Sequence, residues 1–363
     1  MKQRENMKYL LIDANNLAVR CAFANADLQS KAGVPTGVHF GFFQSLVNLI
    51  QKYQDYQMLI VWDGRSKRRM EESKRGVEQG IVPEAYKENR KKAPKPQPLI
   101  NFEQQASFLQ RGIGQTGIPQ IRLHDYEADD IIATYSKMFR DKNEVVMVTS
   151  DKDYLQLLHE NVIMWDGMKS SEYTEASFHQ TYGIMPYQHV HCGALMGDDG
   201  DNIFGVPSWG EATALEAIKE HGTWQKVIDA LVALAEPYRA QFPDLSEEDF
   251  KKLANLKTKT GKPKYPEITF NMPFTGVVLA CDEKKIKPPL SKTTLMAIMF
   301  QERVKLAFSL KQMDTVPGLP SEICMGTFNE ARLVEYFDYY SIESLKEDID
   351  LFKSYASQKV VVT

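Results

Sequence analysis

Five acidic motifs in this chain each lie beside an apolar segment. The fullest example is residues 146–158, where a β-branched apolar run leads into Asp151 and Asp153 and then into an apolar helical pattern. Two such acids repel each other unless a cation lies between them. The pattern therefore predicts one shared metal site. Its nine candidate ligands are Asp13, Asp63, Glu127, Asp129, Asp130, Asp151, Asp153, Asp198 and Asp201.

Ligand sets made only of oxygen select hard cations, so we expect Mg²⁺, with Mn²⁺ able to replace it. So many acids favour two ions that share one substrate, the arrangement used for in-line phosphodiester cleavage. Lys87 and Arg90 could add positive charge for the phosphate. The chain has no Walker lysine loop and no Ser-His-Asp order, which weakens NTPase and acyl-transfer hypotheses.

Alternating strands and helices must position these acids. Apolar runs predict strands at residues 8–12, 58–62, 118–123, 145–148 and 162–165. Asp13, Asp63 and Asp151 follow the ends of three of them. Open α/β sheets bind ligands at the carboxyl ends of parallel strands. We therefore expect an α/β fold with a mainly parallel central sheet flanked by helices.

Two of the acidic motifs could instead be helix caps. Asp13 precedes a helical segment, and a lone acid there is more often a cap than a metal ligand. Glu127, Asp129 and Asp130 occupy the first turn of a predicted helix, where carboxylates also stabilise the helix dipole. Three acids in four residues exceed what capping needs, and Glu127 and Asp130 share a face at i, i+3. The metal hypothesis is therefore preferred.

Residues 65–95 form a basic segment with eleven Lys or Arg and five Glu, whereas the whole chain of 363 residues has a net charge of −4. Few of these residues could enter a core, so the segment is expected to project as an arch or loop. Around Tyr86 an aromatic ring alternates with cations, a combination that stacks a base and holds phosphates. The expected nucleic-acid contacts here are Arg65, Tyr86, Lys87, Arg90 and Lys91.

The second half of the chain reads as mainly helical. Helices are expected at residues 211–221 and from residue 223, after a glycine-bracketed turn at residues 205–210. Exposed amides at such a helix start suit a phosphate backbone, so Gly205, Val206 and Gly210 are candidate DNA contacts. A plain helical hairpin would explain this stretch equally well. Residues 234–300 are interpreted as a surface insertion with a lysine-rich patch.

Some functions are disfavoured by what the chain lacks. No apolar run is long enough for a membrane span or a signal peptide. Four widely spaced cysteines fit free thiols in a reducing cytoplasm. His189 and His191 lie two residues apart on an expected helix, so their side chains point apart and make a poor metal site.

Taken in chain order, the acidic motifs resemble those of the 5′-nuclease family, which includes flap endonucleases and 5′–3′ exonucleases. The matching motifs are Asp13, Trp62-Asp63-Gly64-Arg65, Glu127-Ala128-Asp129-Asp130, Thr149-Ser150-Asp151-Lys152-Asp153 and Gly197-Asp198-Asp199-Gly200-Asp201-Asn202. The likeness is greatest to stand-alone bacteriophage members and to the 5′-nuclease domain of bacterial DNA polymerase I. It covers residues 8 to about 230 and resumes at 302–350.

The resemblance implies a PIN-like nuclease core at residues 1–185, which includes the arch at 65–98, and a helical DNA-binding region at residues 186–363. It also implies a helix–three-turn–helix at about 203–230, which can bind K⁺. One ion would be held or oriented by Asp13, Asp63, Glu127, Asp129 and Asp130, and the second by Asp151, Asp153, Asp198 and Asp201. Lys87, Arg90, Asp130 and Asp153 would act in catalysis.

One motif departs from the family. Members commonly read Gly-Ile-Gly-x-Lys where this chain has Ser208-Trp209-Gly210-Glu211-Ala212, so the lysine that would meet a phosphate is replaced by Ala212. This departure bears on the duplex grip and on the K⁺ site. The lysine patch of the insertion could compensate for the missing lysine.

The expected substrate is DNA with a 5′ flap, a 5′ end or a junction, or an RNA primer on DNA. The implied role is primer removal and repair during replication, in the cytoplasm of a bacterial or phage-infected cell. A polymerase and a single-strand-binding protein are candidate partners, and we expect a monomer with no membrane association. Two alternatives stay open: a catalytically idle protein that recognises DNA junctions, and an RNA-directed nuclease of a related acid-cluster fold, although such nucleases are generally shorter and lack the arch.

Overall fold

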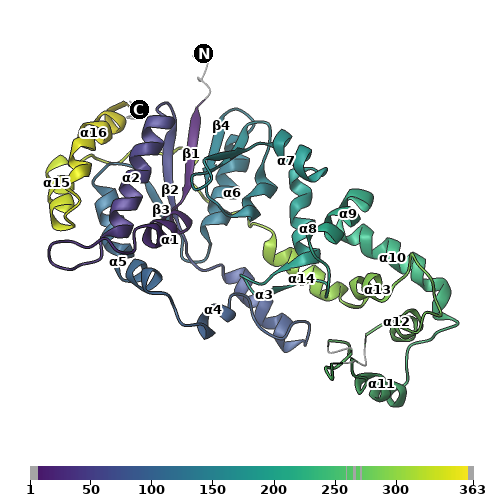
Figure 1. The fold of residues 1–363 in the computed structure, drawn as a ribbon. Helices are drawn as coiled ribbons and strands as arrows, with labels where there is room; N and C mark the ends of the chain where they lie inside the picture. Colours follow the sequence, from purple (N-terminus) through teal and green to yellow (C-terminus); the bar gives the residue numbers. More distant parts are fainter. Residues whose placement is uncertain (1–6, 259, 265–266, 270–271, 359–363) are drawn as a thin grey trace.

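The structure, a computed structural model, describes residues 7–258, 260–264, 267–269 and 272–358 (Figure 1). A six-stranded sheet with the order β3-β2-β1-β4-β5-β6 forms its centre. All neighbouring strands pair in parallel except β5 and β6. The strands are β1 (Lys8–Asp13), β2 (Gln57–Trp62), β3 (Gln120–Arg122), β4 (Glu144–Val148), β5 (Val162–Asp166) and β6 (Ser171–Tyr173). The predicted α/β fold with a mainly parallel sheet is confirmed.

The strand order places the site. β1 lies between β2 and β4. The chain adds β2 and β3 on one side of β1 and then β4, β5 and β6 on the other side. At such a switch point the loops after the two central strands separate and leave a crevice at their carboxyl ends. Asp13 ends β1, and Asp151 follows the loop after β4. The sheet topology therefore brings together two acids that are distant in sequence.

The sheet has an apolar core on each face. Along β1, Tyr9 and Leu11 belong to one buried cluster and Leu10 and Ile12 to the other, as the two-residue period of a strand requires. Helices cover both faces, which gives three layers. The α-helices of the described chain are α1 (Ala14–Ala24), α2 (Gly37–Lys52), α3 (Lys67–Glu78), α4 (Asn89–Lys92), α5 (Gln97–Gly114), α6 (Ala128–Phe139), α7 (Glu175–Tyr182), α8 (His189–Met196), α9 (Glu211–His221), α10 (Trp224–Arg239), α11 (Glu247–Ala254), α12 (Thr275–Asp282), α13 (Lys292–Met299), α14 (Gln301–Lys311), α15 (Glu330–Tyr339) and α16 (Ile349–Gln358). The helices α9 to α13 lie away from the sheet (Figure 1).

The chain's last helices differ from the predicted division at residues 185 and 186. Leu333 and Phe337 of α15 and Phe352 of α16 are buried in the same cluster as Phe43 of α2. Both helices lie beside α2, far from α9 and α10 (Figure 1). Burial of aromatic side chains therefore makes residues 330–358 part of the same core as α2 and the central sheet.

The basic segment is more ordered than a projecting arch would be. Its first part forms α3, whose buried face consists of Arg69, Ser73 and Gly76. Gly76 faces Leu306, which a Cβ would approach to 2.5 Å, so α3 and α14 lie in close contact. The high charge of the segment predicts few core contacts, and the packing of this face differs from that prediction. Small residues at helical spacing allow one face to pack while the cations occupy the other.

The interpretation of residues 234–300 as a surface insertion is also only partly right. Val277 and Val278 of α12 and Leu295 and Ile298 of α13 are buried in the core cluster that includes α10. Lysines of the predicted patch pair with acids: Lys251 with Glu247, Lys252 with Glu248 and Asp249, and Lys264 with Asp282. Lys259 lies outside the described residues. Across the described chain, no helix has the length and apolar character needed to cross a membrane.

Candidate metal-binding cleft

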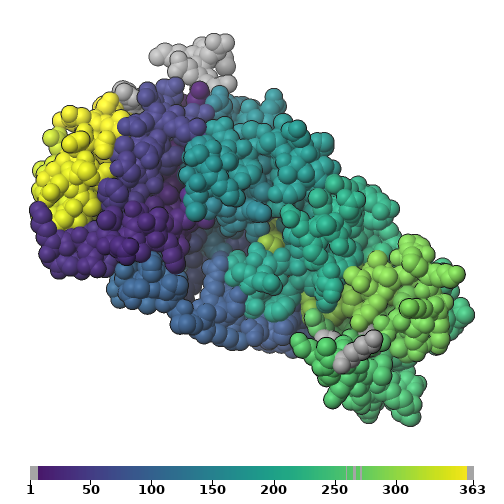
Figure 2. Space-filling model, viewed as in Figure 1, coloured from purple at the N-terminus to yellow at the C-terminus, as the bar shows by residue number. Residues whose placement is uncertain are grey.

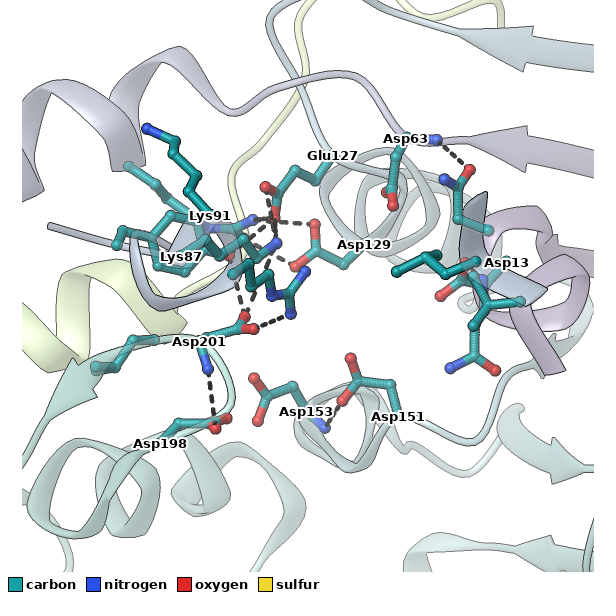
Figure 3. A pocket seen from close by; sticks show the side chains of 18 of the residues that line it. Asp13, Asp63, Lys87, Lys91, Glu127, Asp129, Asp151, Asp153, Asp198 and Asp201 are labelled. Atoms are coloured by element: carbon teal, nitrogen blue, oxygen red, sulfur yellow. Dashed lines mark hydrogen bonds and ion pairs between the residues drawn. The ribbon is translucent and has the colours of Figure 1, made fainter. Parts of the chain in front are cut away.

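A cleft of about 840 Å³ opens at the carboxyl ends of β1, β2 and β4. The space-filling view shows the molecule hollowed between the first helices, the basic segment and the middle of the chain (Figure 2). Eight of the nine predicted carboxylates line the cleft, and they surround its open centre (Figure 3). These eight are Asp13, Asp63, Glu127, Asp129, Asp151, Asp153, Asp198 and Asp201.

Three of them, Asp13, Asp63 and Asp151, are here called the strand-edge carboxylates because they follow β1, β2 and β4. Each accepts a hydrogen bond from a backbone N–H: Asp13 from Asn16 at 3.0 Å, Asp63 from Ala128 at 2.8 Å, and Asp151 from Asp153 at 2.8 Å. Asp13 thus caps α1, as the capping alternative proposed, and it also lines the cleft. No lysine or arginine among the described residues forms an ion pair with any of the three.

Burial and mutual repulsion raise the pKa of all three strand-edge carboxylates. Burial is the larger cause for Asp13, followed by the charge of Asp63, and the pKa rises to about 8. For Asp63, burial and then Glu127 raise the pKa to about 6. For Asp151, burial and then Asp153 raise it to about 7. These carboxylates would be stabilised in their charged form by a cation.

The other five predicted carboxylates of the cleft, here called the paired carboxylates, each contact a lysine or arginine. Arg69 of α3 lies 2.8 Å from a Glu127 oxygen and 3.0 Å from an Asp129 oxygen, and its side chain is 1% exposed. Lys87 donates to both Glu127 oxygens at 2.9 Å. The basic segment therefore supplies two cations to the acids at the start of α6.

The remaining three paired carboxylates are Asp153, Asp198 and Asp201. Lys311, the last residue of α14, places Nζ 2.9 Å from Asp153 and 3.1 Å from Asp198. Arg90 donates to Asp201. Burial would raise the pKa of Asp198, but the charge and hydrogen bond of Lys311 outweigh it and leave the pKa below its usual value. This contact could not be predicted from local spacing, because Lys311 and Asp153 are 158 residues apart in the sequence.

Asp130 does not line the cleft, which differs from the prediction that it holds or orients a metal ion. Its side chain is fully buried, accepts from Arg69 at 2.8 Å and from the backbone N–H of Asp314 at 2.7 Å, and caps the N–H of Glu127. Glu127 is the N-cap of α6 and not a helical residue. The helical face that it was expected to share with Asp130 therefore does not exist.

The donor chemistry of the cleft fits a hard divalent cation. Eight of the predicted carboxylates face one open space, and three of them, the buried Asp13, the half-buried Asp63 and the more exposed Asp151, have no cation partner among the described residues. Within the described part of the chain, no three acidic, histidine or cysteine side chains converge tightly enough to hold an ion as they stand. Lysine and arginine side chains pair with the other five of these carboxylates.

The basic segment also provides the other wall of the cleft. Tyr86, Lys87, Arg90 and Lys91 line it, whereas Arg65 is exposed outside it. The hydroxyl of Tyr86 donates to Glu127 at 3.0 Å and to Asp201 at 3.2 Å, so this ring is held at the acids; the predicted stacking on a base stays a prediction. Lys87 has a positive φ of 57° and donates its backbone N–H to the carbonyl of Asp201. This bond ties the basic segment to the fifth acidic motif.

The glycine-bracketed turn lies outside the cleft lining. Gly205 packs so closely that a Cβ would lie 2.3 Å from the Met196 carbonyl carbon, and the N–H of Val206 donates to Leu195. Packing therefore explains both residues without DNA. Gly210 differs: it is the N-cap of α9, and a Cβ there would meet nothing within 4 Å. The helices predicted after this turn are confirmed as α9 and α10.

Three residues of this site were not predicted: Arg69, Lys311 and Tyr154, whose hydroxyl donates to Asp13 at 3.1 Å. Arg69 is one of many cations in its segment, but its spacing from Ser73 and Gly76 marks the buried face of a helix. Lys311 similarly continues the apolar spacing of Val304 and Ala307 on α14, where a lysine needs a buried partner. Helical periodicity could therefore have singled out both cations.

Comparisons with known proteins agree with this geometry. Residues 8–183 match the family described as "5′-3′ exonuclease, N-terminal resolvase-like domain". A 5′-3′ exonuclease of Aquifex aeolicus (strain VF5) is 30% identical over 252 residues, which are 68% of this chain and 81% of that protein. DNA polymerase I of Bacillus subtilis (strain 168) is 32% identical over 232 residues, 62% of this chain but only 25% of the polymerase.

Among solved structures, the 5′-exonuclease of bacteriophage T5 with bound zinc has a TM-score of 0.57 at 18% identity, and the match covers 97% of both chains. A T5 flap endonuclease in a pseudo-enzyme-product complex with DNA and metal ions gives 0.55 at 18% identity, over 96% of this chain and 99% of that one. At this level of identity the likeness concerns the fold.

Proposed function

The chain belongs to the 5′–3′ exonuclease family, and from this premise we propose that it is a structure-specific 5′-nuclease that cleaves DNA at 5′ ends and flaps with two Mg²⁺ ions. One observation carries the proposal: eight of the predicted metal ligands and four of the predicted nucleic-acid contacts, Tyr86, Lys87, Arg90 and Lys91, line a single cleft. Acids that hold divalent ions and cations that attract a phosphate backbone are the two features that a metal-dependent phosphodiesterase combines.

Two groups of carboxylates would hold the ions. Asp13, Asp63, Glu127 and Asp129 would take the first, while Asp151, Asp153, Asp198 and Asp201 would take the second. Neighbouring charges that raise the pKa of Asp151 come from Asp153, Asp129 and Asp201, so this residue faces both groups. When bound, such ions lower the pKa of a water molecule and neutralise charge that develops on the phosphate. Mn²⁺ would replace Mg²⁺ at these oxygen ligands.

Lys87 and Arg90 would bind the phosphate beside the acids. Both now neutralise carboxylates, Lys87 at Glu127 and Arg90 at Asp201. A substrate that brings its own anionic oxygens gives these cations new partners while the divalent ions neutralise the acids. Asp130 would act as a positioning residue: through Arg69 and the cap of Glu127, it fixes the first turn of α6.

Duplex DNA would contact the helical region outside the cleft. Its exposed helix start at Gly210 offers backbone N–H groups to a phosphate, and the following helices α9 and α10 form the predicted hairpin. Residues 186–311 would thus form the DNA-binding part of the protein. A K⁺ ion at the turn would assist this grip, although Ala212 offers no charge of its own.

The test uses a 5′-labelled flap oligonucleotide with the full chain in Mg²⁺, in Mn²⁺ and in EDTA. An Asp129→Asn variant removes a cleft carboxylate, and Asp141→Asn, whose side chain is 79% exposed beside Arg140, serves as the matched control. We expect cleavage near the junction with either metal, no cleavage in EDTA, and full activity only in the control variant.

Substrate position then separates the activities. A label at the first nucleotide of the 5′ strand distinguishes stepwise release of single nucleotides from release of the intact flap. A substrate with an RNA 5′ strand tests primer removal. Tight junction binding without cleavage in either metal would contradict the enzyme and favour the catalytically idle alternative, which the exonuclease relatives do not support.

A further inference from the structure

Lys311 makes an ion pair that the proposed nuclease chemistry does not explain. Its single ammonium lies 2.9 and 3.0 Å from the two oxygens of Asp153 and 3.1 Å from an oxygen of Asp198. Its side chain is 5% exposed. The lysine therefore occupies the space between two carboxylates that are assigned above to the second divalent ion.

The stem of Lys311 is built into the fold. It passes α8 at Gly193, where a Cβ would lie 2.7 Å from Cδ of Lys311, so only glycine leaves room for it. Gln156 donates to the carbonyl of Lys311 at 3.2 Å and to that of Asp153 at 2.8 Å. One amide thus links the backbone of the lysine to the backbone of its carboxylate partner. Such fixation at both ends differs from a flexible surface lysine.

The end of α14 is held on its other side by α3. Arg68 donates to the carbonyl of Ser309 at 2.7 Å and to that of Gln312 at 2.9 Å, and it pairs with Asp314. These bonds hold the backbone two residues before Lys311, at Ser309, and one residue after it, at Gln312. The ammonium is consequently directed into the cleft by contacts from α3, α8 and the turn that carries Asp153.

We propose that Lys311 is a resident cation of the Asp153–Asp198 pair and competes there with the second divalent ion. Two cations cannot share the same carboxylate oxygens at short distance without strong repulsion, so the ion binds only when the ammonium moves away. Two ligands of the first ion, Asp13 and Asp63, have no ion-pair partner among the described residues, whereas three of the four ligands of the second ion, Asp153, Asp198 and Asp201, pair with a lysine or arginine. Without DNA the protein should therefore bind one divalent ion tightly and a second one weakly.

This inference rests on the proposed two-ion function and specifies when the second ion enters. A phosphate of the bound substrate offers Lys311 another anionic partner, which frees Asp153 and Asp198. Occupation of the second site would then depend on substrate. Lys311 is a positioning residue in this account, because it acts through the carboxylates.

The test measures Mn²⁺ binding to the DNA-free full chain, by the electron-paramagnetic-resonance signal of the unbound ion. Lys311→Met keeps the apolar stem and removes the charge. Lys305→Met, on the same helix with a 70% exposed side chain near Glu302, is the matched control. We expect the second site to bind Mn²⁺ about tenfold or more tightly in Lys311→Met, as for close charge pairs, and to be unchanged in the control.

Folding of the variant is checked separately. Lys311→Met leaves Asp153 and Asp198 without their cation, so its melting temperature without metal should fall and should rise more with Mn²⁺ than that of the unaltered protein. In the double variant Asp153→Asn/Lys311→Met, the gain in Mn²⁺ affinity should disappear. If Lys311→Met is unfolded without metal, the Mn²⁺ concentration that restores its fold reports the affinity of the variant for Mn²⁺.

Identical Mn²⁺ titrations of Lys311→Met and the unaltered protein would overturn the proposal, as would weaker binding in the variant. Equal affinity of the two sites in the unaltered protein would overturn it too. None of these titrations contains DNA. Absence of flap cleavage with the expected Mn²⁺ binding would therefore contradict the nuclease function alone, whereas normal cleavage with identical titrations would contradict only the role of Lys311.

Discussion

The strand-edge and the paired carboxylates share one cleft but differ in how their charge is balanced. Asp13, Asp63 and Asp151 accept backbone hydrogen bonds and have no ion-pair partner among the described residues. The five paired carboxylates contact Arg69, Lys87, Arg90 or Lys311. Burial and repulsion raise the pKa in the first group, whereas Lys311 holds the pKa of Asp198 down.

A metal-dependent cleft must attract a divalent ion and must also stay folded without it, and the two groups of carboxylates serve these two needs differently. Unbalanced buried charge favours uptake of a divalent ion but destabilises the protein without it. Charge balanced by lysine and arginine stabilises the metal-free protein but weakens the attraction for an ion. The chain combines the two, so one side of the cleft is prepared for metal while the other is held by the protein itself.

The largest effect on the flap-cleavage rate is expected from replacing a strand-edge carboxylate. Asp13→Asn should lower the flap-cleavage rate about a thousandfold, because it removes a charge that nothing else supplies, while Asn can still cap α1. Asp198→Asn should lower it less, since Lys311 already neutralises that carboxylate. Single-turnover rates of the two variants, with melting temperatures as the control for folding, test the comparison. An equal loss in both variants would contradict the distinction between the groups.

The next effect is on stability. Arg69→Met should destabilise the metal-free protein by about 3–5 kcal/mol, because it leaves Asp129 and Asp130 without a cation partner and Glu127 with Lys87 alone. It would make these paired carboxylates resemble the strand edge. Urea unfolding measures the loss, and Arg75→Met, an exposed position on the same helix, should change little. A loss below about 1 kcal/mol would show that Arg69 does not balance the acids.

A smaller effect concerns the cations that would reach the phosphate. Lys87→Met should slow cleavage about a hundredfold at saturating substrate, because a positioned charge next to the reacting phosphate is lost. Arg90→Met should slow it less, because its side chain is 57% exposed and water screens its charge. Lys91→Met should mainly weaken binding, since its ammonium pairs with Glu88 away from the acids. A pure change in KM for Lys87→Met would contradict the catalytic role.

The smallest effect is a pH dependence of stability. The strand-edge carboxyls have a higher pKa in the folded protein than the 3.8 of an ordinary aspartate, so the folded state binds more protons. Their stabilising contribution is present below that value and is lost as the pH rises through about 6 to 8. The metal-free protein should lose stability over this range.

Metal should oppose this loss, because an ion takes the place of the protons. The rise in melting temperature on adding Mn²⁺ should therefore grow from pH 6 to pH 8. Melting in EDTA and in Mn²⁺ across this range measures it, and Asp63→Asn should reduce the dependence. A stabilisation by Mn²⁺ that does not change with pH would argue that the strand edge is already charged without metal.

The sequence predicted the sheet and most of the acids that line the cleft. Apolar strand runs ending in Asp13, Asp63 and Asp151 are local signals, and parallel strands bring such ends to one edge of the sheet. The predictions failed where a side chain's environment depends on distant contacts. The Asp130 carboxylate points into the protein, where it accepts from Arg69 and from the backbone N–H of Asp314, and α3 packs because Gly76 fits against Leu306 of α14.

Residue types and spacing by themselves determined that this chain carries an oxygen-rich metal site at the end of a parallel sheet, because both features are written within short segments. Only the tertiary structure decided which carboxylates are balanced. Arg69 and Lys311 reach the acids from helices 58 and 158 residues away from their partners Glu127 and Asp153. The physical reason is that the charge state of a buried acid depends on every group packed around it, and packing joins residues that the sequence separates.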